Sequence, residues 1–148
     1  KLKEVGLDEV IIGFEAVTEE ELKYYNKGTK VLDYPKVIGL LNNNNIDYTA
    51  LFMVQSNYGL KDFLKLYKFI KKNKIETYTL SIYTPIKGTK GYESQKESLL
   101  TTNPKYFDFL HLVTKSRLPK PIFYLFFYAI HIRLLKSTRI FKYILRSK

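Results

Sequence analysis

The stretch IDYTALFMVQSNYGLKDFLKLYKFIKKNKIETYTLSIYT, residues 46–84, decides the fold because it places a helix between two strands. Apolar residues recur at helical spacing from Leu60 to Ile70, with lysines on the opposite side. Segments 46–54 and 75–84 are rich in β-branched and aromatic residues, which is typical of strands. Two strands joined by a helix lie parallel in one sheet through a right-handed crossover.

The preceding residues extend the same alternation. Segment 8–15 has an apolar run that suits a strand buried on both faces. Thr18 begins a capping box, which predicts a helix from that residue. A second helix should have Asp33 as its N-cap and Pro35 in its first turn, and should end at the asparagine run 42–45. The order strand, helix, strand, helix, strand predicts an α/β layer, and three parallel strands do not close a barrel.

Charge divides the chain into two parts. The 148 residues carry a formal net charge of +11, yet all 14 acidic residues lie at or before Asp108. Nine of the 25 basic residues follow position 114, among aromatic residues. We therefore expect an α/β domain over residues 1–91 and a helical, basic, aromatic-rich extension over residues 92–148.

The extension has two possible roles. Its apolar run between Pro121 and His131 is nine residues long, well short of the ~20 that cross a bilayer. Either its helix covers the open barrel with a basic face toward solvent, which we favour, or the basic tail lies on an anionic membrane surface. We expect a cytoplasmic protein, with peripheral contact at the inner membrane face in the second case.

Several classes are disfavoured by composition. The chain has no cysteine, which excludes disulfides and thiolate metal sites within it. Its first residues are charged and amphipathic, unlike a secretory signal. It lacks RNP-like, zinc and helix-turn-helix signatures, so no specific nucleic-acid binding is expected. A start without methionine and an opening that reads as the end of a helix lead us to expect a fragment of a longer protein.

Three short stretches follow the predicted strands: GFEAVT, VQSNYG and TPIKGTKGY. In parallel sheets and barrels, ligands bind at the carboxyl ends of the strands. A strand that stops on proline and glycine presents backbone N–H and C=O groups there, as TPIKGTKGY would. The three stretches therefore predict a ligand site at one edge of the sheet.

These stretches, in this order, resemble the second half of the radical S-adenosylmethionine (SAM) barrel. The likeness rests on GFEAVTEEELKYYNKGT, FMVQSNYGLKDFLKLYKFI, TPIKGTKGY and LLTTNPKYFDFLHLVTKSRLPKPIFY, and covers residues 4–128. TPIKGT resembles the family's Thr-Pro-Leu-Pro-Gly-Thr loop. The subgroup it resembles most is the cobalamin-binding one that includes hopanoid C-3 methylase and anaerobic protoporphyrin-ester cyclase.

The resemblance implies a partial barrel whose other half carries a Cys-x3-Cys-x2-Cys loop that ligates a 4Fe-4S cluster, and also implies a cobalamin domain. That half would be the partner of this chain, in cis or as a separate subunit, and a small molecule would be the substrate. Since this chain has no cysteine, the cluster ligands lie outside it and the chain alone should be inactive. SAM would then support radical or methyl-transfer chemistry on an unknown substrate, and a lipid-like one would suit a basic tail that lies on a membrane surface.

The resemblance also suggests cofactor-binding residues. Glu15 would accept the ribose hydroxyls of SAM; its alternative is an exposed carboxylate before a helix. Gln55 and Ser56 would bind the ribose or carboxylate, although the neighbouring Asn57 could equally cap the next helix. The adenine would meet the backbone and apolar edge of a loop made of Thr84, Pro85 and Ile86, whose alternative is a plain turn.

Candidates for the substrate side are Tyr92, Asp108, His111 and Arg117. Asp108 and His111 could form an acid–base or orienting pair, because a carboxylate fixes the histidine tautomer. Their spacing puts them on one side only in a helix. A structural histidine is the favoured alternative.

Two functions remain open from the sequence. The first is part of a radical SAM iron-sulfur enzyme. The second is a non-catalytic remnant or split subunit that binds a partner or membrane through its basic tail.

Overall fold

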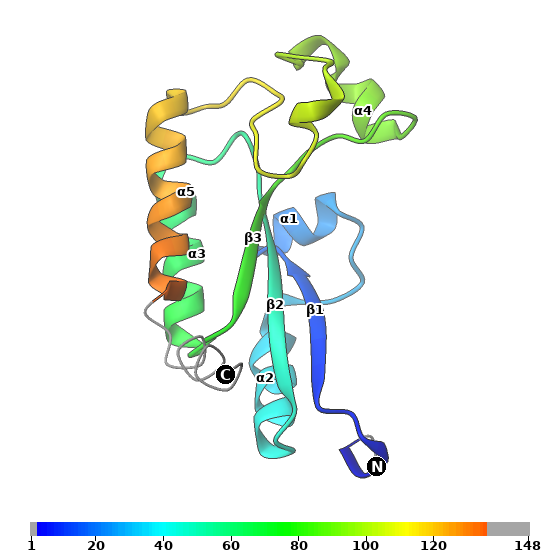
Figure 1. Ribbon diagram of the computed structural model, residues 1–148, viewed down its shortest axis with the longest axis vertical. Helices are drawn as coiled ribbons and strands as arrows, with labels where there is room; N and C mark the ends of the chain where they lie inside the picture. The colour runs from blue at the N-terminus through cyan, green and yellow to red at the C-terminus, as the bar shows by residue number, and fades with distance from the viewer. Residues whose placement is uncertain (1–2, 136–148) are drawn as a thin grey trace, which may run out of the picture.

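The computed structural model describes residues 3–135, and for residues 133–135 it describes the backbone alone. Three parallel strands form one open sheet in the order β1-β2-β3, with β1 at Glu9–Glu15, β2 at Asp47–Val54 and β3 at Tyr78–Ile82. The α/β class and the partial barrel predicted from the sequence are confirmed (Figure 1).

Helices connect and cover the strands. The main ones are α1 (Glu19–Tyr24), α2 (Tyr34–Asn43), α3 (Leu60–Lys72) and α5 (Lys120–Leu135), with a short α4 at Lys90–Gln95. Single 3-10 turns lie at Lys3–Val5, Val31–Asp33, Lys96–Ser98 and Pro104–Tyr106. In Figure 1, α3 and α5 lie side by side along the sheet.

Some helix ends follow the sequence and others differ. Helix α2 has Pro35 in its first turn and ends at Asn43, within the predicted asparagine run. Thr18 is the N-cap of α1, as predicted, and its hydroxyl accepts from the N–H of Glu21 at 3.3 Å. The Glu21 carboxylate accepts from that hydroxyl at 2.9 Å and not from the Thr18 backbone N–H, so the second bond of the predicted capping box is replaced by a side-chain contact. Asp33 occupies the N-cap position of α2, but its side chain makes no capping bond because the residue has helical φ and ψ. Asn57 does not cap α3; Gly59 does, and its N–H donates to the Asp62 carboxylate at 2.9 Å.

One face of the sheet is packed and the other is open. Alternate β2 residues, Tyr48 to Val54, are buried beneath the helices, whereas the residues between them are half-buried. The prediction that the first strand is buried on both faces is wrong: Ile11 is 70% exposed, because no described element covers that face.

The last helix completes the packed face. Phe123 and Phe127 are fully buried, and the Phe123 ring lies 5.2 Å from that of Phe63 on α3. The Tyr78 hydroxyl donates to the carbonyl of Ile130 at 2.5 Å, which ties α5 to β3. Helix α5 therefore packs on β3 and α3 on the outside of the partial barrel. Its solvent-facing side differs from the basic face that we expected: within the described residues that side is mostly apolar, with Ile122, Leu125 and Tyr128 exposed. The predicted division between residues 91 and 92 stays a prediction, and the basic residues beyond Leu135 lie outside the described residues.

Candidate functional site

The three predicted loops lie at the same edge of the sheet. Glu15 stands beside Phe52 in the β1–β2 register, and Ile82 stands beside Val54 in the β2–β3 register. Because the strands are parallel, the residues that follow them emerge together at the carboxyl edge. The sequence-predicted cofactor residues are thus brought to one edge (Figure 1).

Glu15 turns its carboxylate onto the open face of the sheet. The β1 register shifts between Gly13 and Glu15, and Glu15 has φ of 65°. Its carboxylate lies over Gly13, in the space that a Cβ would fill, on the side opposite Phe14. Lys27 pairs with it at 3.2 Å. Such a half-buried carboxylate can accept hydroxyl groups from a ligand on the open face.

Tyr34 fixes the strand end that presents this carboxylate. Its hydroxyl donates to the carbonyl of Phe14 at 2.6 Å, and the two rings lie 4.4 Å apart. Burial raises the pKa of Tyr34 to about 12. This contact joins α2 to the residue before Glu15 and was not foreseen from the sequence.

Gln55 and Ser56 line an open pocket of about 460 Å³. Its other lining residues come from α1, the β2–α3 loop and α4: Glu20, Glu21, Tyr24, Asn57 and Gln95. The Gln55 amide donates to the hydroxyl of Tyr25, and the Ser56 carbonyl accepts from the N–H of Arg117 at 3.0 Å. The two polar residues that follow β2 are thus held by Tyr25 at the end of α1 and by Arg117 in the segment before α5.

Three tyrosines form a cluster beside this pocket that the sequence reading missed. The ring centroids of Tyr24, Tyr25 and Tyr83 lie 5.5 to 6.4 Å apart. Desolvation raises the pKa of the Tyr25 hydroxyl, so that group stays protonated and is available as a hydrogen-bond donor or acceptor. In the sequence, only the adjacent Tyr24 and Tyr25, at the last residue and the C-cap of α1, indicate an aromatic cluster.

The loop after β3 presents backbone and one apolar side chain. Thr84 is 4% exposed and its hydroxyl donates to the carbonyl of Ile82 at 3.1 Å, while Pro85 is buried. Ile86 is 57% exposed, and the N–H of Thr89 closes a turn on its carbonyl at 3.1 Å. Among the described residues, the N–H groups of Thr84 and Ile86 meet no backbone carbonyl. This arrangement offers donors and an apolar edge to a flat polar ring.

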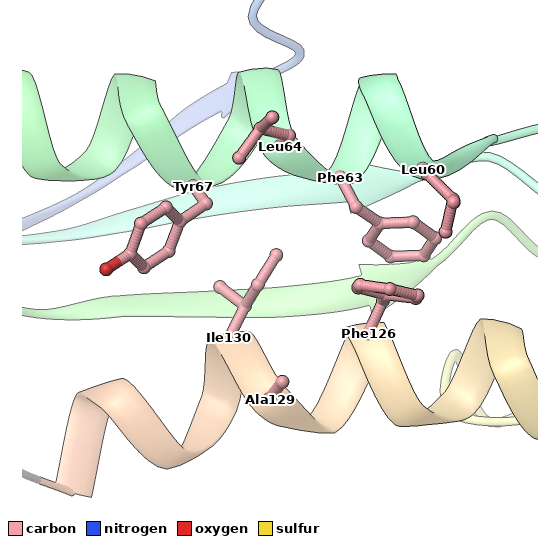
Figure 2. Close-up of a pocket in the computed structure, with 7 residues that line it drawn as sticks. All are labelled: Leu60, Phe63, Leu64, Tyr67, Phe126, Ala129 and Ile130. Atoms are coloured by element: carbon pink, nitrogen blue, oxygen red, sulfur yellow. The ribbon is translucent and has the colours of Figure 1, made fainter.

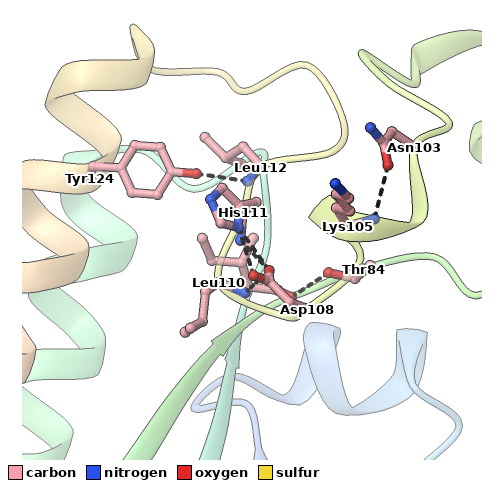
Figure 3. A network of polar contacts seen from close by, with 9 residues as sticks. Thr84, Asn103, Lys105, Asp108, Leu110, His111, Leu112 and Tyr124 are labelled. Carbon is pink, nitrogen blue, oxygen red and sulfur yellow. Dashed lines mark hydrogen bonds and ion pairs between the residues drawn. The ribbon is translucent and has the colours of Figure 1, made fainter.

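Asp108 and His111 form a pair in a turn, and not in the helix that their spacing predicts. One Asp108 oxygen accepts the N–H groups of Leu110 and His111, each at 3.0 Å, and the other lies 2.8 Å from Nδ1 of His111 (Figure 3). These backbone bonds, that of Leu110 first, hold the pKa of Asp108 below its usual 3.8. Phe109 has φ of 63°, so the chain turns tightly enough to bring both side chains together.

The Asp108 loop is anchored on both sides. Ile82 donates its N–H to the carbonyl of Phe109 at 2.6 Å, and Leu112 donates its N–H to the hydroxyl of Tyr124 at 2.8 Å. Of the other substrate-side candidates, Tyr92 is 7% exposed on α4, and the exposed Arg117 has its guanidinium over Gly59. Their roles stay predictions.

Metal ligation finds no support in residues 3–135: no group of three or more His, Asp or Glu side chains there could hold an ion. Across the same residues, no helix has both the length and the apolar content to cross a bilayer.

Comparison with curated proteins finds relatives over most of the chain. It is 30% identical to the bacteriochlorophyllide d C-8(2)-methyltransferase of Chlorobaculum tepidum over 129 residues, which are 84% of this chain and 29% of that protein. Identity is 31% over 114 residues to the C-12(1)-methyltransferase of the same organism, covering 76% of this chain and 25% of the relative. Hopanoid C-3 methylase of Methylococcus capsulatus is 23% identical over 122 residues, which are 82% of this chain and 24% of that protein.

No family model matches the chain. The chain spans between 24% and 29% of the length of these relatives. Their similarity supports a relation to radical SAM methyltransferases, at low identity, and this is the level at which the resemblance seen in the sequence is confirmed.

Proposed function

We propose that this chain is the second half of the catalytic barrel of a radical SAM methyltransferase and that it binds the adenosine part of SAM. The observation that carries the proposal is the carboxylate of Glu15, which lies on the open sheet face beside two further strand ends. The relation to methyltransferases supplies the reaction class.

The residues at the carboxyl edge fit the adenosine part of SAM. Glu15 would accept the two ribose hydroxyls, in place of its contact with Lys27. The N–H groups near Thr84 and the exposed side chain of Ile86 would meet the adenine. Gln55 and Ser56, at the pocket between α1 and α4, would bind the ribose or carboxylate.

The iron-sulfur cluster does not fit this chain, because it has no cysteine to ligate iron. We therefore propose that the ligands, and any cobalamin, belong to another part of the same protein or to a separate subunit. Two features of β1 support such a partner. On the open face of the sheet Ile11 is 70% exposed. At the edge of the sheet, within the described residues, β1 pairs with β2 alone.

The names of the relatives suggest the kind of acceptor. They act on bacteriochlorophyllide d and on hopanoids, so we propose a large, mostly apolar small molecule. Asp108 and His111 would orient it, since their exposed pair lies beside β3. Tyr92 and Arg117 are further candidates on that side.

The test uses the native protein or complex that contains this chain. It should hold a 4Fe-4S cluster and, when reduced, should form 5′-deoxyadenosine or S-adenosylhomocysteine from SAM. Glu15→Gln should weaken SAM binding at least about ten-fold, because it removes a charge-assisted bond. The matched control is Glu97→Gln, which changes an exposed glutamate in the 3-10 turn after α4. Equal SAM affinity in wild type and Glu15→Gln would contradict the proposal.

A non-catalytic remnant or split subunit is the second candidate, favoured by the lack of cysteine. Co-purification from source cells decides between the two. A cysteine-bearing partner or a longer product with iron supports the enzyme. A product without iron that does not bind SAM supports the remnant.

A further inference from the structure

Helix α5 has a second apolar face that points away from the sheet. Phe123, Phe127 and Ile130 pack inward and are at most 4% exposed. Four large apolar or aromatic side chains lie on the outward side, each between 40% and 66% exposed: Ile122, Leu125, Tyr128 and Ile132. Their spacing of three or four residues places them in one stripe along the helix.

An apolar groove continues this stripe toward α3. It has a volume of about 210 Å³ and no charged lining residue, and it is formed by Leu60, Phe63, Leu64, Tyr67, Phe126, Ala129 and Ile130 (Figure 2). Leu60 and Leu64 are 51% and 48% exposed. Ala129 lies one turn from Leu125, so groove and stripe meet on α5. We call the stripe and the groove together the α3–α5 surface.

Lysines border the α3–α5 surface. Helix α3 carries five exposed lysines and a single acidic residue, Asp62. Three of the lysines lie one turn from Leu64 or Tyr67 of the groove: Lys61, Lys68 and Lys71. Lys65 and Lys72 lie farther round the helix, beside Val17 and Phe69. An apolar surface with a cationic border suits the interface of an anionic bilayer, where apolar side chains enter the acyl boundary and lysines meet lipid phosphates.

We propose that the α3–α5 surface docks this protein on an anionic membrane surface, with α5 lying in the plane of the interface. A second copy fits less well. Two-fold contact would set the lysine border of one copy against the same border of the other, and like charges in contact disfavour association. The surface lies outside the barrel edge, so docking does not depend on the proposed SAM site.

A tryptophan introduced on the α3–α5 surface can report the docking as the difference from the wild-type spectrum, because this chain has no tryptophan of its own. Leu125→Trp in the full protein should shift its emission to the blue with vesicles of phosphatidylglycerol and phosphatidylcholine, and brominated lipid should quench it. The control is Leu40→Trp on α2, where the native leucine is 65% exposed against 66% for Leu125. Leu40→Trp should show neither change.

Vesicle co-sedimentation then tests affinity. Leu125→Asp should weaken partitioning at least about ten-fold, by loss of apolar insertion and by repulsion from the lipid. Leu40→Asp should partition as the wild type does, and high salt should weaken binding of both. Each native leucine is exposed, so both variants should keep the thermal transition of the wild type.

Three results would overturn the proposal. They are equal partitioning of Leu125→Asp and wild type, equal binding to pure phosphatidylcholine, and a dimer that Leu125→Asp converts to monomer without vesicle binding. The last would make the α3–α5 surface an interface between copies. SAM binding measured in the same samples separates failure of docking from failure of the proposed function.

Discussion

The carboxylate of Glu15 occupies the space that a Cβ at Gly13 would fill. Two residues earlier on the strand, glycine leaves room on the open face, and the side chain of Glu15 folds back into that room beside Lys27. The position of the carboxylate therefore depends on a residue that carries no side chain.

Gly13→Ala should displace the Glu15 carboxylate while the strand persists. Gly13 does not have a positive φ, so alanine fits its backbone and the free energy of unfolding should change by less than about 1 kcal/mol. SAM affinity of the complete protein should fall about as far as in Glu15→Gln. Isothermal titration and thermal melts measure the two effects.

Gly39→Ala on α2 is the matched control, since a Cβ there has nothing within 4 Å. It should raise stability by up to about 1 kcal/mol through helix propensity and leave SAM affinity unchanged. If Gly13→Ala binds SAM as well as Gly39→Ala does, the placement of Glu15 has no role in binding.

Local sequence patterns predicted the elements well. The N-cap at Thr18 and the helical spacing after Gly59 depend on neighbours within one turn, and both are found where expected. The strand expected over residues 75–84 is only Tyr78–Ile82, because its pairing with β2 begins at Tyr78. Sequence propensity did not define that end.

Contacts between distant residues could not be predicted in the same way. Gln55 meets Tyr25 across 30 residues, and neither position shows a pattern that requires the other. The Asp108–His111 pair was judged by helical spacing, yet a turn with two backbone bonds to Asp108 forms it. Ile11 is exposed on an apolar strand because no described element packs on that face of the sheet.

Tyr34→Phe should alter stability and its dependence on alkaline pH. The variant loses the bond to the Phe14 carbonyl, at a cost of about 0.5–1.5 kcal/mol. Since the Tyr34 pKa is raised from 10.0 to about 12, its neutral form stabilises the fold fully below pH 10, and this part is lost as pH rises through 12. Urea unfolding should give free energies of unfolding for wild type and variant whose difference shrinks as the pH rises from about 10 to about 12. A constant difference would contradict the assigned pKa.

Asp108→Asn should remove an acid-sensitive element of the loop beside β3. The Asp108 pKa lies below 3.8, so its charged form supports the turn above that pH and the support is lost as pH falls through the folded pKa. Carbon-detected NMR of the carboxyl group should give a midpoint below 3.8 in the wild type. His111→Ala should raise that midpoint only in part, because the Leu110 N–H remains. A midpoint at or above 3.8 in the wild type would show that the turn does not form.

Tyr83 and Gly91 should show a strong energetic coupling, since the Tyr83 hydroxyl lies 2.6 Å from where a Cβ on Gly91 would stand. In the wild type, Gly91→Ala should destabilise by about 1–3 kcal/mol, because the hydroxyl or α4 must move. In a Tyr83→Phe background the obstacle is absent, and alanine should stabilise α4 by up to about 1 kcal/mol. The effect of Gly91→Ala on stability should thus reverse in sign between the two backgrounds. A double-mutant cycle of urea unfolding should give a coupling energy of at least about 1 kcal/mol. Additive effects would mean that α4 does not pack on Tyr83. The pocket lined by Ser56, Tyr24 and Gln95 would then lack the side that α4 forms.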